Sequence, residues 1–226
     1  MITTTQDAAG VSVSTGRRDA GVAEDYYSLF HWLRSVGGPS ESAPMSVGIT
    51  SCAPRAGVST VAANLAIAAA QVSDQPVLLL DLGSPRQAMT TRLSAAGDGF
   101  RVVSDPAQIS ASIRPSRFEN LSVLDASTAG SLRGWNLDCN KATELLRAVE
   151  NDFGFIVVDL PPVDSSQCFV TAGALHGVLL VMEAERTRSD IAVRAKQRLA
   201  DSRANILGII LNNHPQHLPQ WLETRL

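Results

Sequence analysis

Short apolar runs, most of them unbroken, that are separated by helical patterns are the feature that most constrains this fold. A strand buried on both faces has an unbroken apolar run, whereas a half-exposed strand alternates apolar and polar residues. Such runs occur at residues 47–49, 77–80, 121–124, 155–158, 178–181 and 206–211. Helical patterns are clearest at residues 60–71, 141–151 and 189–204. Strands that alternate with helices predict a doubly wound α/β fold, with a mostly parallel sheet flanked by helices on both faces.

Length and composition favour one such domain. The chain has 226 residues, of which 45% are hydrophobic, enough for one sizeable core. We predict a single α/β domain over residues 21–226. Residues 1–20 are small and polar without a period, so we predict a disordered N-terminal tail there.

Charge, cysteines and hydropathy exclude several classes of protein. A net charge of -3 provides no general attraction to nucleic acid, so no nucleic-acid partner is expected. The cysteines, Cys52, Cys139 and Cys168, are odd in number and lack C-x-x-C spacing, which favours free thiols in a reducing compartment. No apolar run reaches the roughly 18 residues that span a bilayer, and no signal-peptide pattern opens the chain. We therefore predict a cytoplasmic protein with no transmembrane segment.

Three features that could bind a ligand or take part in catalysis follow predicted strands. They are the glycine-containing loop over residues 51–60, Asp81 and Asp159. One aspartate after a strand is more often a helix cap or turn residue than a catalytic group. Ligands of doubly wound sheets bind at the carboxyl ends of the strands, where all three features are expected to meet. Together they predict a ligand site.

The loop has part of the chemistry of a phosphate-binding loop. Such loops surround phosphate with backbone N–H groups and a helix N-terminus, and a lysine and a magnesium-binding hydroxyl neutralise the charge. Gly57, Ser59 and Thr60 match these requirements. Val58 occupies the lysine position and Arg55 replaces an expected glycine, so the pattern GxxxxGK[ST] is not matched.

The stretch SCAPRAGVSTVAANLAIAAAQ resembles the first motif of bacterial tyrosine autokinases, which belong to the partitioning-type P-loop ATPases. The family pattern is approximately S-x-x-P-G-x-G-K-S-T-x-x-A-x-N-L-A. Nine residues fit it: Ser51, Pro54, Gly57, Ser59, Thr60, Ala63, Asn64, Leu65 and Ala66. Arg55 and Val58 depart from it at the two positions most closely tied to phosphate, so the chain resembles a degenerate member.

The resemblance continues downstream to about residue 213. Residues 77–81 are similar to a D-x-D motif that keeps Asp81 but has Gly83 in place of its second aspartate. Asp159 lies in a segment that resembles the Walker B strand and its D-x-P-P ending. Asn212 ends a strand similar to the one whose asparagine contacts adenine, and Thr187 also matches the family.

These matches imply roles for individual residues. Asp81 and Asp159 would be remnants of the catalytic acids. The nucleotide would contact four residues, Gly57, Ser59, Thr60 and Asn212. If nucleotide and magnesium bind, Ser59 and Asp159 would be the metal ligands.

Two regulatory features of the family are altered. Family members commonly begin with an E-x-x-R-x-x-R-like helix that packs subunits into a ring, and this chain has Glu24, Tyr27 and Phe30 at that spacing. Autophosphorylating members usually end in a tyrosine cluster. The only tyrosines here are Tyr26 and Tyr27, so the phosphoacceptor tail is absent.

The missing lysine weighs against catalysis more than against binding. Its charge-assisted hydrogen bonds would contribute roughly 1.5–3 kcal/mol, or about one to two orders of magnitude in affinity. Removing one positioned charge typically slows phosphoryl transfer about 100- to 1,000-fold. Arg55 or Arg86 could supply a substitute cation, but an arginine at a glycine position would crowd the turn and be strained at a positive φ.

Our leading hypothesis is a catalytically inactive, tyrosine-kinase-like P-loop protein. The resemblance implies a regulatory or scaffolding role in capsule or exopolysaccharide biosynthesis and export. The implied partner is a membrane polysaccharide co-polymerase or an active kinase paralogue, which would recruit the chain to the inner face of the plasma membrane, and a homo-oligomer is compatible. We expect no cofactor, or ATP and magnesium if the site still functions.

Two alternatives remain open. The first is an ATP-binding tyrosine autokinase or ATPase of the same pathway that uses a substitute cation. The second is a chromosome- or division-site-partitioning ATPase, which fits the D-x-P-P segment less well.

The histidines His176, His214 and His217 lack metal-ligand spacing and are interpreted as structural or surface residues. Trp221 and Leu222 could form a short amphipathic contact.

Overall fold

The computed structural model describes residues 2–3, 12–15, 20–37, 43–83, 93, 109–125 and 139–212. Its strands are β1 (Ile2–Thr3), β2 (Ser12–Thr15), β3 (Met45–Ser51), β4 (Val77–Asp81), β5 (Arg114–Pro115), β6 (Leu121–Asp125), β7 (Phe155–Asp159), β8 (Gly177–Glu183) and β9 (Ile206–Asn212). Its helices are α1 (Ala20–Gly37), α2 (Val58–Val72), α4 (Ile109–Ser112), α5 (Cys139–Glu150), α6 (Ser166–Ala172) and α7 (Ser189–Asp201).

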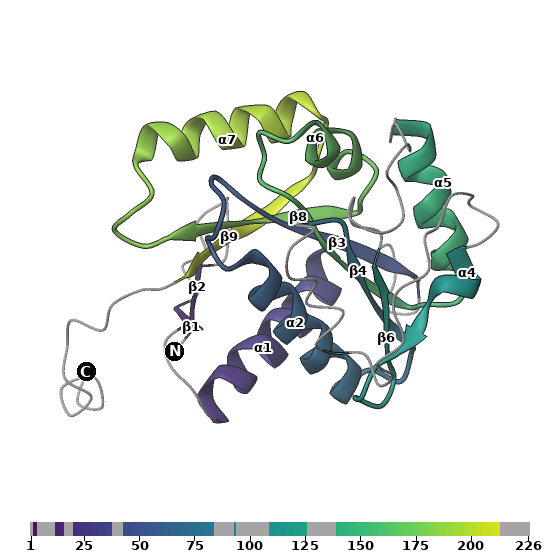
Figure 1. Cartoon of the computed structure of the whole chain (residues 1–226). Coiled ribbons are helices and arrows are strands. Elements are labelled where there is room, and N and C mark those ends of the chain that lie inside the picture. The colour runs from purple at the N-terminus through teal and green to yellow at the C-terminus, as the bar shows by residue number, and fades with distance from the viewer. Residues whose placement is uncertain are drawn as a thin grey trace.

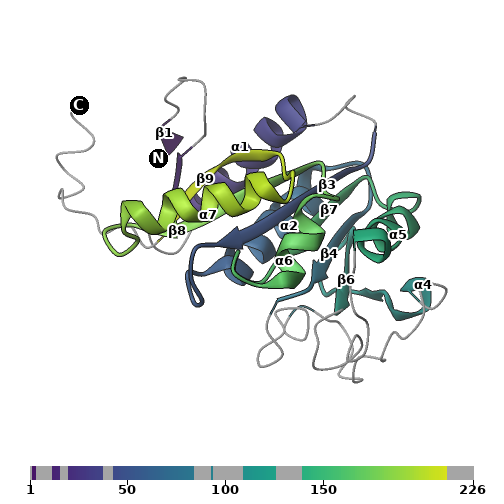
Figure 2. The same ribbon diagram turned by 90° about the horizontal axis from the view of Figure 1, so that it is seen from above.

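The strands form one sheet in the order β1-β2-β9-β8-β3-β7-β4-β6-β5. All neighbouring strands from β2 to β6 in this order are parallel, and only the outermost pairs, β1 with β2 and β5 with β6, are antiparallel. Helices α1 and α2 cover one face, and α5, α6 and α7 cover the other (Figures 1 and 2). The predicted doubly wound, mostly parallel sheet is therefore confirmed.

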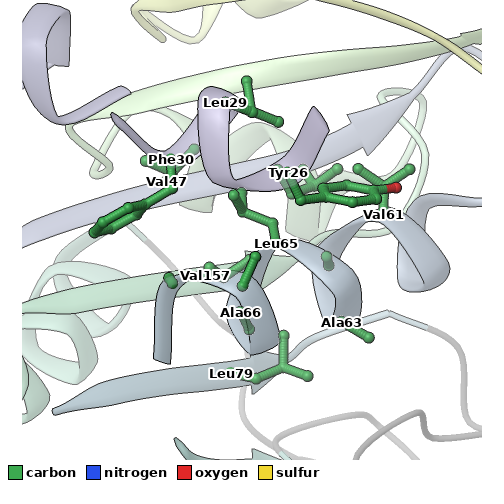
Figure 3. Packing of buried hydrophobic residues seen from close by; sticks show 14 of the residues in the cluster. Tyr26, Leu29, Phe30, Val47, Val61, Ala63, Leu65, Ala66, Leu79 and Val157 are labelled. Atoms are coloured by element: carbon green, nitrogen blue, oxygen red, sulfur yellow. The ribbon is translucent and has the colours of Figure 1, made fainter. Parts of the chain in front are cut away.

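Two apolar cores explain why the strands have unbroken apolar runs. Successive residues of β4 point to opposite faces of the sheet. Leu79 belongs to the core under α1 and α2. Leu80 belongs to the core under α5, α6 and α7. Figure 3 shows the first core, where Tyr26, Leu29 and Phe30 of α1 meet α2 and the sheet. A parallel sheet buried on both faces requires apolar side chains in both directions.

The six predicted strands are present, and the three predicted helices are present with shifted ends. Helix α7 ends at Asp201 rather than residue 204, because Arg203 adopts a left-handed φ of 61° and the chain turns into β9. Helix α6 was not predicted; it is a single short helix of 7 residues, too short to show a period.

Two short strands lie within residues 1–20, the segment predicted as a disordered tail. Ser12–Thr15 forms β2, which pairs in parallel with β9, and Ile2–Thr3 pairs with β2. Without β2, the backbone N–H and C=O groups on the outer edge of β9 would be unpaired. These backbone groups can bind a short polar segment that has no apolar pattern of its own. The other residues of the predicted tail lie outside the described residues, apart from Ala20, where α1 begins.

Candidate functional site

The glycine-containing loop lies at the centre of the sheet, between the end of β3 and the start of α2. Gly57 is the N-cap of α2 and has a left-handed φ of 90°, and its carbonyl oxygen accepts from the N–H of Val61 at 3.0 Å. No side chain caps this helix. The strand–loop–helix geometry is that of a phosphate-binding loop, in which backbone N–H groups at a helix N-terminus provide the anion-binding groups.

Arg55 has the strained conformation expected from its replacement of glycine. Its φ is 69°, in the left-handed region, and the residue is exposed. A side chain in this region costs roughly 1–2 kcal/mol because Cβ approaches the following carbonyl oxygen. The loop therefore keeps a backbone shape that suits glycine although the residue has changed. Arg86, the other arginine considered as a substitute cation, lies outside the described residues.

Val58, at the lysine position, packs against the apolar core under α1 and α2 and is half-buried. Thr60 is exposed. Ser59 is half-buried and its side chain hydrogen-bonds Asp159. The loop thus places a hydroxyl, but not a cation, beside the acid of the Walker B-like strand.

Three aspartates lie at the ends of three adjacent parallel strands. In the ladder, Asp81 is opposite Asp159 on one side and Asp125 on the other. All three are buried, with exposed fractions of 2%, 3% and 8%, respectively. Sequence reasoning identified the first two and missed Asp125, although it directly follows the apolar run 121–124, the signal that identified the others.

Burial raises the pKa of Asp159 to about 6 from its ordinary 3.8, and the hydrogen bond from Ser59 opposes this increase. The neighbouring Gly83 donates its backbone N–H to Oδ1 of Asp81 at 2.9 Å. A Cβ at Gly83 would lie 3.3 Å from carboxylate oxygens of both Asp81 and Asp159. A second aspartate here would therefore add a carboxyl group next to two existing acids, where like-charge repulsion favours either a protonated carboxyl or a bound cation.

The D-x-P-P segment is fastened to the strand that leads into the loop. The N–H of Leu160 donates to the Ile49 carbonyl at 2.9 Å, and Thr50 Oγ1 donates to the Pro161 carbonyl at 2.7 Å. The N–H of Val163 donates to the Ser51 carbonyl at 3.0 Å. These bonds hold the Walker B-like segment and the loop in a common frame.

Asn212 reaches the loop from β9. Its Nδ2 donates to the Ala56 carbonyl at 2.8 Å, so the amide expected to face adenine contacts the loop itself. Thr187 Oγ1 accepts from the N–H of Glu183 at 3.1 Å, which makes Thr187 a turn residue between β8 and α7. The structure therefore brings five predicted site residues to the carboxyl end of the sheet, at Gly57, Ser59, Asp81, Asp159 and Asn212. The sixth, Thr60, follows Ser59 in the first turn of α2 and is exposed.

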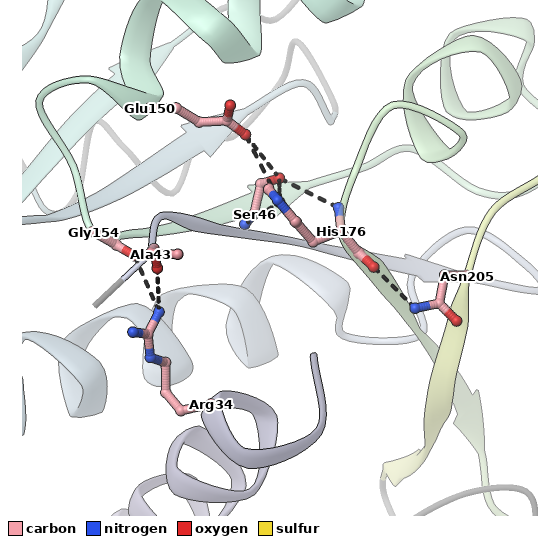
Figure 4. Close-up of polar contacts among 7 residues, drawn as sticks. All are labelled: Arg34, Ala43, Ser46, Glu150, Gly154, His176 and Asn205. Carbon is pink, nitrogen blue, oxygen red and sulfur yellow. Dashed lines mark hydrogen bonds and ion pairs between the residues drawn. The ribbon is translucent and has the colours of Figure 1, made fainter. Parts of the chain in front are cut away.

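His176 belongs to a polar cluster outside the loop site (Figure 4). Its Nδ1 accepts from the backbone N–H of Ser46 at 3.1 Å and lies 2.8 Å from Ser46 Oγ, and Glu150 Oε1 is 3.8 Å from it. Because these contacts share one ring nitrogen, the cluster is not a nucleophile–base–acid relay. It joins β3, α5 and the residue before β8, so the structural interpretation of His176 is confirmed. His214, His217, Trp221 and Leu222 lie outside the described residues.

The helix compared with the ring-forming helix is packed into the core of its own chain. Phe30 is 5% exposed and makes an edge-to-face contact with Phe155, with ring centroids 5.0 Å apart. Tyr27 is half-buried and donates to Gln71 of α2, whereas Glu24 is exposed. Phe30 therefore packs within its own chain and does not project toward a neighbouring subunit.

A cleft of about 390 Å³ lies beside the start of β7, at the opposite end of the strands from the loop. Its lining includes Phe30, Arg34 and Asp74. Arg34 Nη1 donates to the carbonyls of Ala43 and Gly154, at 3.0 and 3.4 Å (Figure 4). These bonds join α1 to the segments before β3 and β7, a structural role.

In the described ranges of the chain, no group of three or more His, Cys, Asp or Glu side chains is arranged to hold a metal ion. None of the helices in the described part of the chain is both long and apolar enough to cross a bilayer.

Solved structures define the class of protein. The chain superimposes on the kinase domain of the Escherichia coli tyrosine kinase ETK with a TM-score of 0.71 and 21% identity, covering 88% of this chain and 78% of that one. The septum site-determining protein MinD from Pyrococcus horikoshii, complexed with Mg-ADP, matches with a TM-score of 0.60 and 19% identity, covering 80% and 76%. The fold is that of the P-loop NTPases.

Relatives found by sequence similarity indicate the kind of P-loop protein more narrowly than the solved structures do. CapB of Staphylococcus aureus is 27% identical over 178 residues, 78% of each chain. The tyrosine-protein kinase CpsD of Streptococcus agalactiae is 26% identical over 204 residues, covering 88% of this chain and 86% of CpsD. No family model matches the chain. Its homologues are bacterial tyrosine-protein kinases, which confirms the resemblance predicted from the motifs.

Proposed function

We propose that this chain is a catalytically inactive, tyrosine-kinase-like P-loop protein that regulates or scaffolds capsule or exopolysaccharide biosynthesis. One observation carries the proposal: the loop keeps its phosphate-binding backbone shape, whereas Val58 packs into the core at the position of the catalytic lysine. The functional domain would comprise residues 21–226.

The charges around the loop fit ATP and magnesium poorly. Arg55 is the only cationic residue in the loop sequence, and it is exposed. The acids Asp81, Asp125 and Asp159 are buried on neighbouring strands. Negative phosphate beside buried carboxylates requires compensating positive charge, which the lysine would otherwise supply. If nucleotide and magnesium were bound, Ser59 and Asp159 would hold the metal, which would neutralise phosphate charge, and Gly57, Thr60 and Asn212 would contact the nucleotide.

The tyrosines are also poorly placed for autophosphorylation. Tyr26 is 2% exposed, within the core under α1 and α2. The Tyr27 hydroxyl donates to Gln71 and its ring packs against the same core. Phosphorylation of Tyr26 would require α1 to separate from that core, and phosphorylation of Tyr27 would break its bond to Gln71. This packing supports a binding role over self-phosphorylation.

The choice of partner rests on the resemblance to bacterial tyrosine autokinases, and CapB and CpsD are named as tyrosine-protein kinases. We propose a membrane polysaccharide co-polymerase or an active kinase paralogue, because a protein without catalysis can act only through binding. A fluorescent fusion of the full chain is expected at sites of polysaccharide export. Localisation at the nucleoid or the division site would instead support a partitioning protein.

Calorimetric titration with ATP and magnesium tests the loss of activity. The unmodified chain is expected to bind weakly and to hydrolyse no ATP above background. The variant Arg55→Gly/Val58→Lys is expected to bind about 10- to 100-fold more tightly, because it regains the charge-assisted bonds. Arg55→Gly alone is the matched control, since it relaxes the loop without adding a cation. Low-micromolar binding with hydrolysis by the unmodified chain would refute the proposal.

The second candidate is an ATP-dependent tyrosine kinase with a substitute cation, favoured by the retained contact between Ser59 and Asp159. It predicts phosphotyrosine on Tyr26, Tyr27 or a partner, which disappears in Asp159→Asn. Phosphotyrosine mapping by mass spectrometry, with the partner present, separates the two candidates.

A further inference from the structure

Asn212 is in direct contact with the two residues that precede α2. Its side chain is buried and its Nδ2 donates to the Ala56 carbonyl at 2.8 Å. A Cβ built on Gly57 would lie 2.2 Å from the same nitrogen. The Asn212 amide therefore fills the space that a side chain at Gly57 would need. The contact joins residues 156 positions apart in the sequence.

The backbone of Asn212 is held by the strands on both sides of β9. On the β8 side, Asn212 is paired with Glu183, and its carbonyl accepts from the Ala184 N–H at 3.0 Å. On the other side, Thr15 of β2 is paired with Asn212. Strand β2 thus ends beside the residue that contacts the loop.

We propose that Asn212 is a positioning residue for the glycine-containing loop, and that pairing of β2 with β9 determines where Asn212 lies. The amide holds the Ala56 carbonyl and so orients the peptide that leads into Gly57. The N-terminal segment Ser12–Thr15 supports this contact from the far side of β9. The role goes beyond the proposed function, because it applies whether the loop binds nucleotide, another anion or a protein partner.

Cys52 provides a local probe of the loop. It lies in the loop and is 7% exposed, whereas Cys168, on the buried side of α6, is 0% exposed and reports wider opening of the chain. Cys139 is exposed and is replaced by serine in every sample. Iodoacetamide labelling of the full chain, followed by peptide mass spectrometry, gives separate rates for Cys52 and Cys168. A buried thiol reacts when local opening exposes it.

Two substitutions test the two parts of the proposal. Asn212→Asp keeps the shape but removes the donor, and should accelerate Cys52 labelling about five- to tenfold with little change at Cys168. Val13→Pro/Ser14→Pro removes two adjacent N–H groups of β2, one of which faces β9 whichever way the strand alternates. This variant should accelerate Cys52 labelling by a similar factor.

Combination and control variants make the test decisive. The combined variant should label no faster than either parent variant, because both act on one contact. Val123→Ala, which weakens the core at β6, should accelerate labelling of Cys168 at least as much as labelling of Cys52, the opposite pattern to Asn212→Asp. An unchanged rate in Asn212→Asp would overturn the positioning role. An unchanged rate in the strand variant, or additive effects in the combination, would overturn the coupling to β2.

Discussion

Asp159 is a buried carboxyl whose ionisation destabilises the fold. Its pKa is about 6 in the folded protein against an ordinary 3.8, with burial as the main cause. Above pH 6 it is ionised in both folded and unfolded chains. Between pH 6 and 3.8 the folded chain retains a proton that the unfolded chain has lost, so this group's contribution to the unfolding free energy rises as pH falls.

Replacing Asp159 by Asn should therefore stabilise the protein at neutral pH. One pKa unit corresponds to about 1.4 kcal/mol, so the difference between the two pKa values gives about 3 kcal/mol. The Asn side chain can keep the hydrogen bond with Ser59. For a chain of this size, about 3 kcal/mol corresponds to roughly 6–12 °C in Tm. The gain should be largest above pH 6 and disappear below about pH 4, where Asp159 is neutral in both states.

Urea denaturation followed by circular dichroism at pH 7.5, 5.5 and 4.5 measures this effect as the difference between variant and parent. That difference cancels the titration of carboxyls that lie far from residue 159. Asp74→Asn, at an exposed position, is the control and should change the unfolding free energy by less than about 0.5 kcal/mol at every pH. A variant that is less stable at pH 7.5, or a difference that does not depend on pH, would refute the reasoning.

Three further substitutions test the loop and the α1 packing by the same denaturation assay. Arg55→Gly should raise the unfolding free energy by about 1 kcal/mol, because it removes the strain at φ 69°, and Arg55→Ala, which keeps that strain, should not. Gly57→Ala should lower it by about 1–3 kcal/mol, since φ is 90° and the new Cβ would meet Asn212; an unchanged value would contradict this geometry. Phe30→Ala should lower it by about 3–5 kcal/mol through lost contact with Phe155, whereas a cost below about 1 kcal/mol would place Phe30 outside the core.

Much of the fold could be predicted from local patterns. The apolar runs located all six long strands, because burial on both faces leaves a continuous signature in the sequence. Helices α2, α5 and α7 were located by their period. Helix α6 was missed because its 7 residues give no period, and β2 because its polar residues depend on the edge of β9 for pairing.

The candidate site was predicted only in part. Asp81 and Asp159 were found from their places after apolar runs, and Asp125 had the same signal without a motif to draw attention to it. The sequence showed that Val58 replaces a lysine, but its packing against the core under α1 and α2 depends on how those helices lie on the sheet.

The sequence by itself determined the fold class and the positions of the main strands, because buried strands and helices leave apolar runs and periods in neighbouring residues. It also showed that the lysine is missing, because that position is read directly from the motif. The tertiary structure decided which acids are neighbours, since the strand order places β7 between β3 and β4 and β6 beyond β4. It also decided that Asn212 contacts the loop rather than only following a strand. Such contacts depend on long-range strand pairing, which no local pattern specifies.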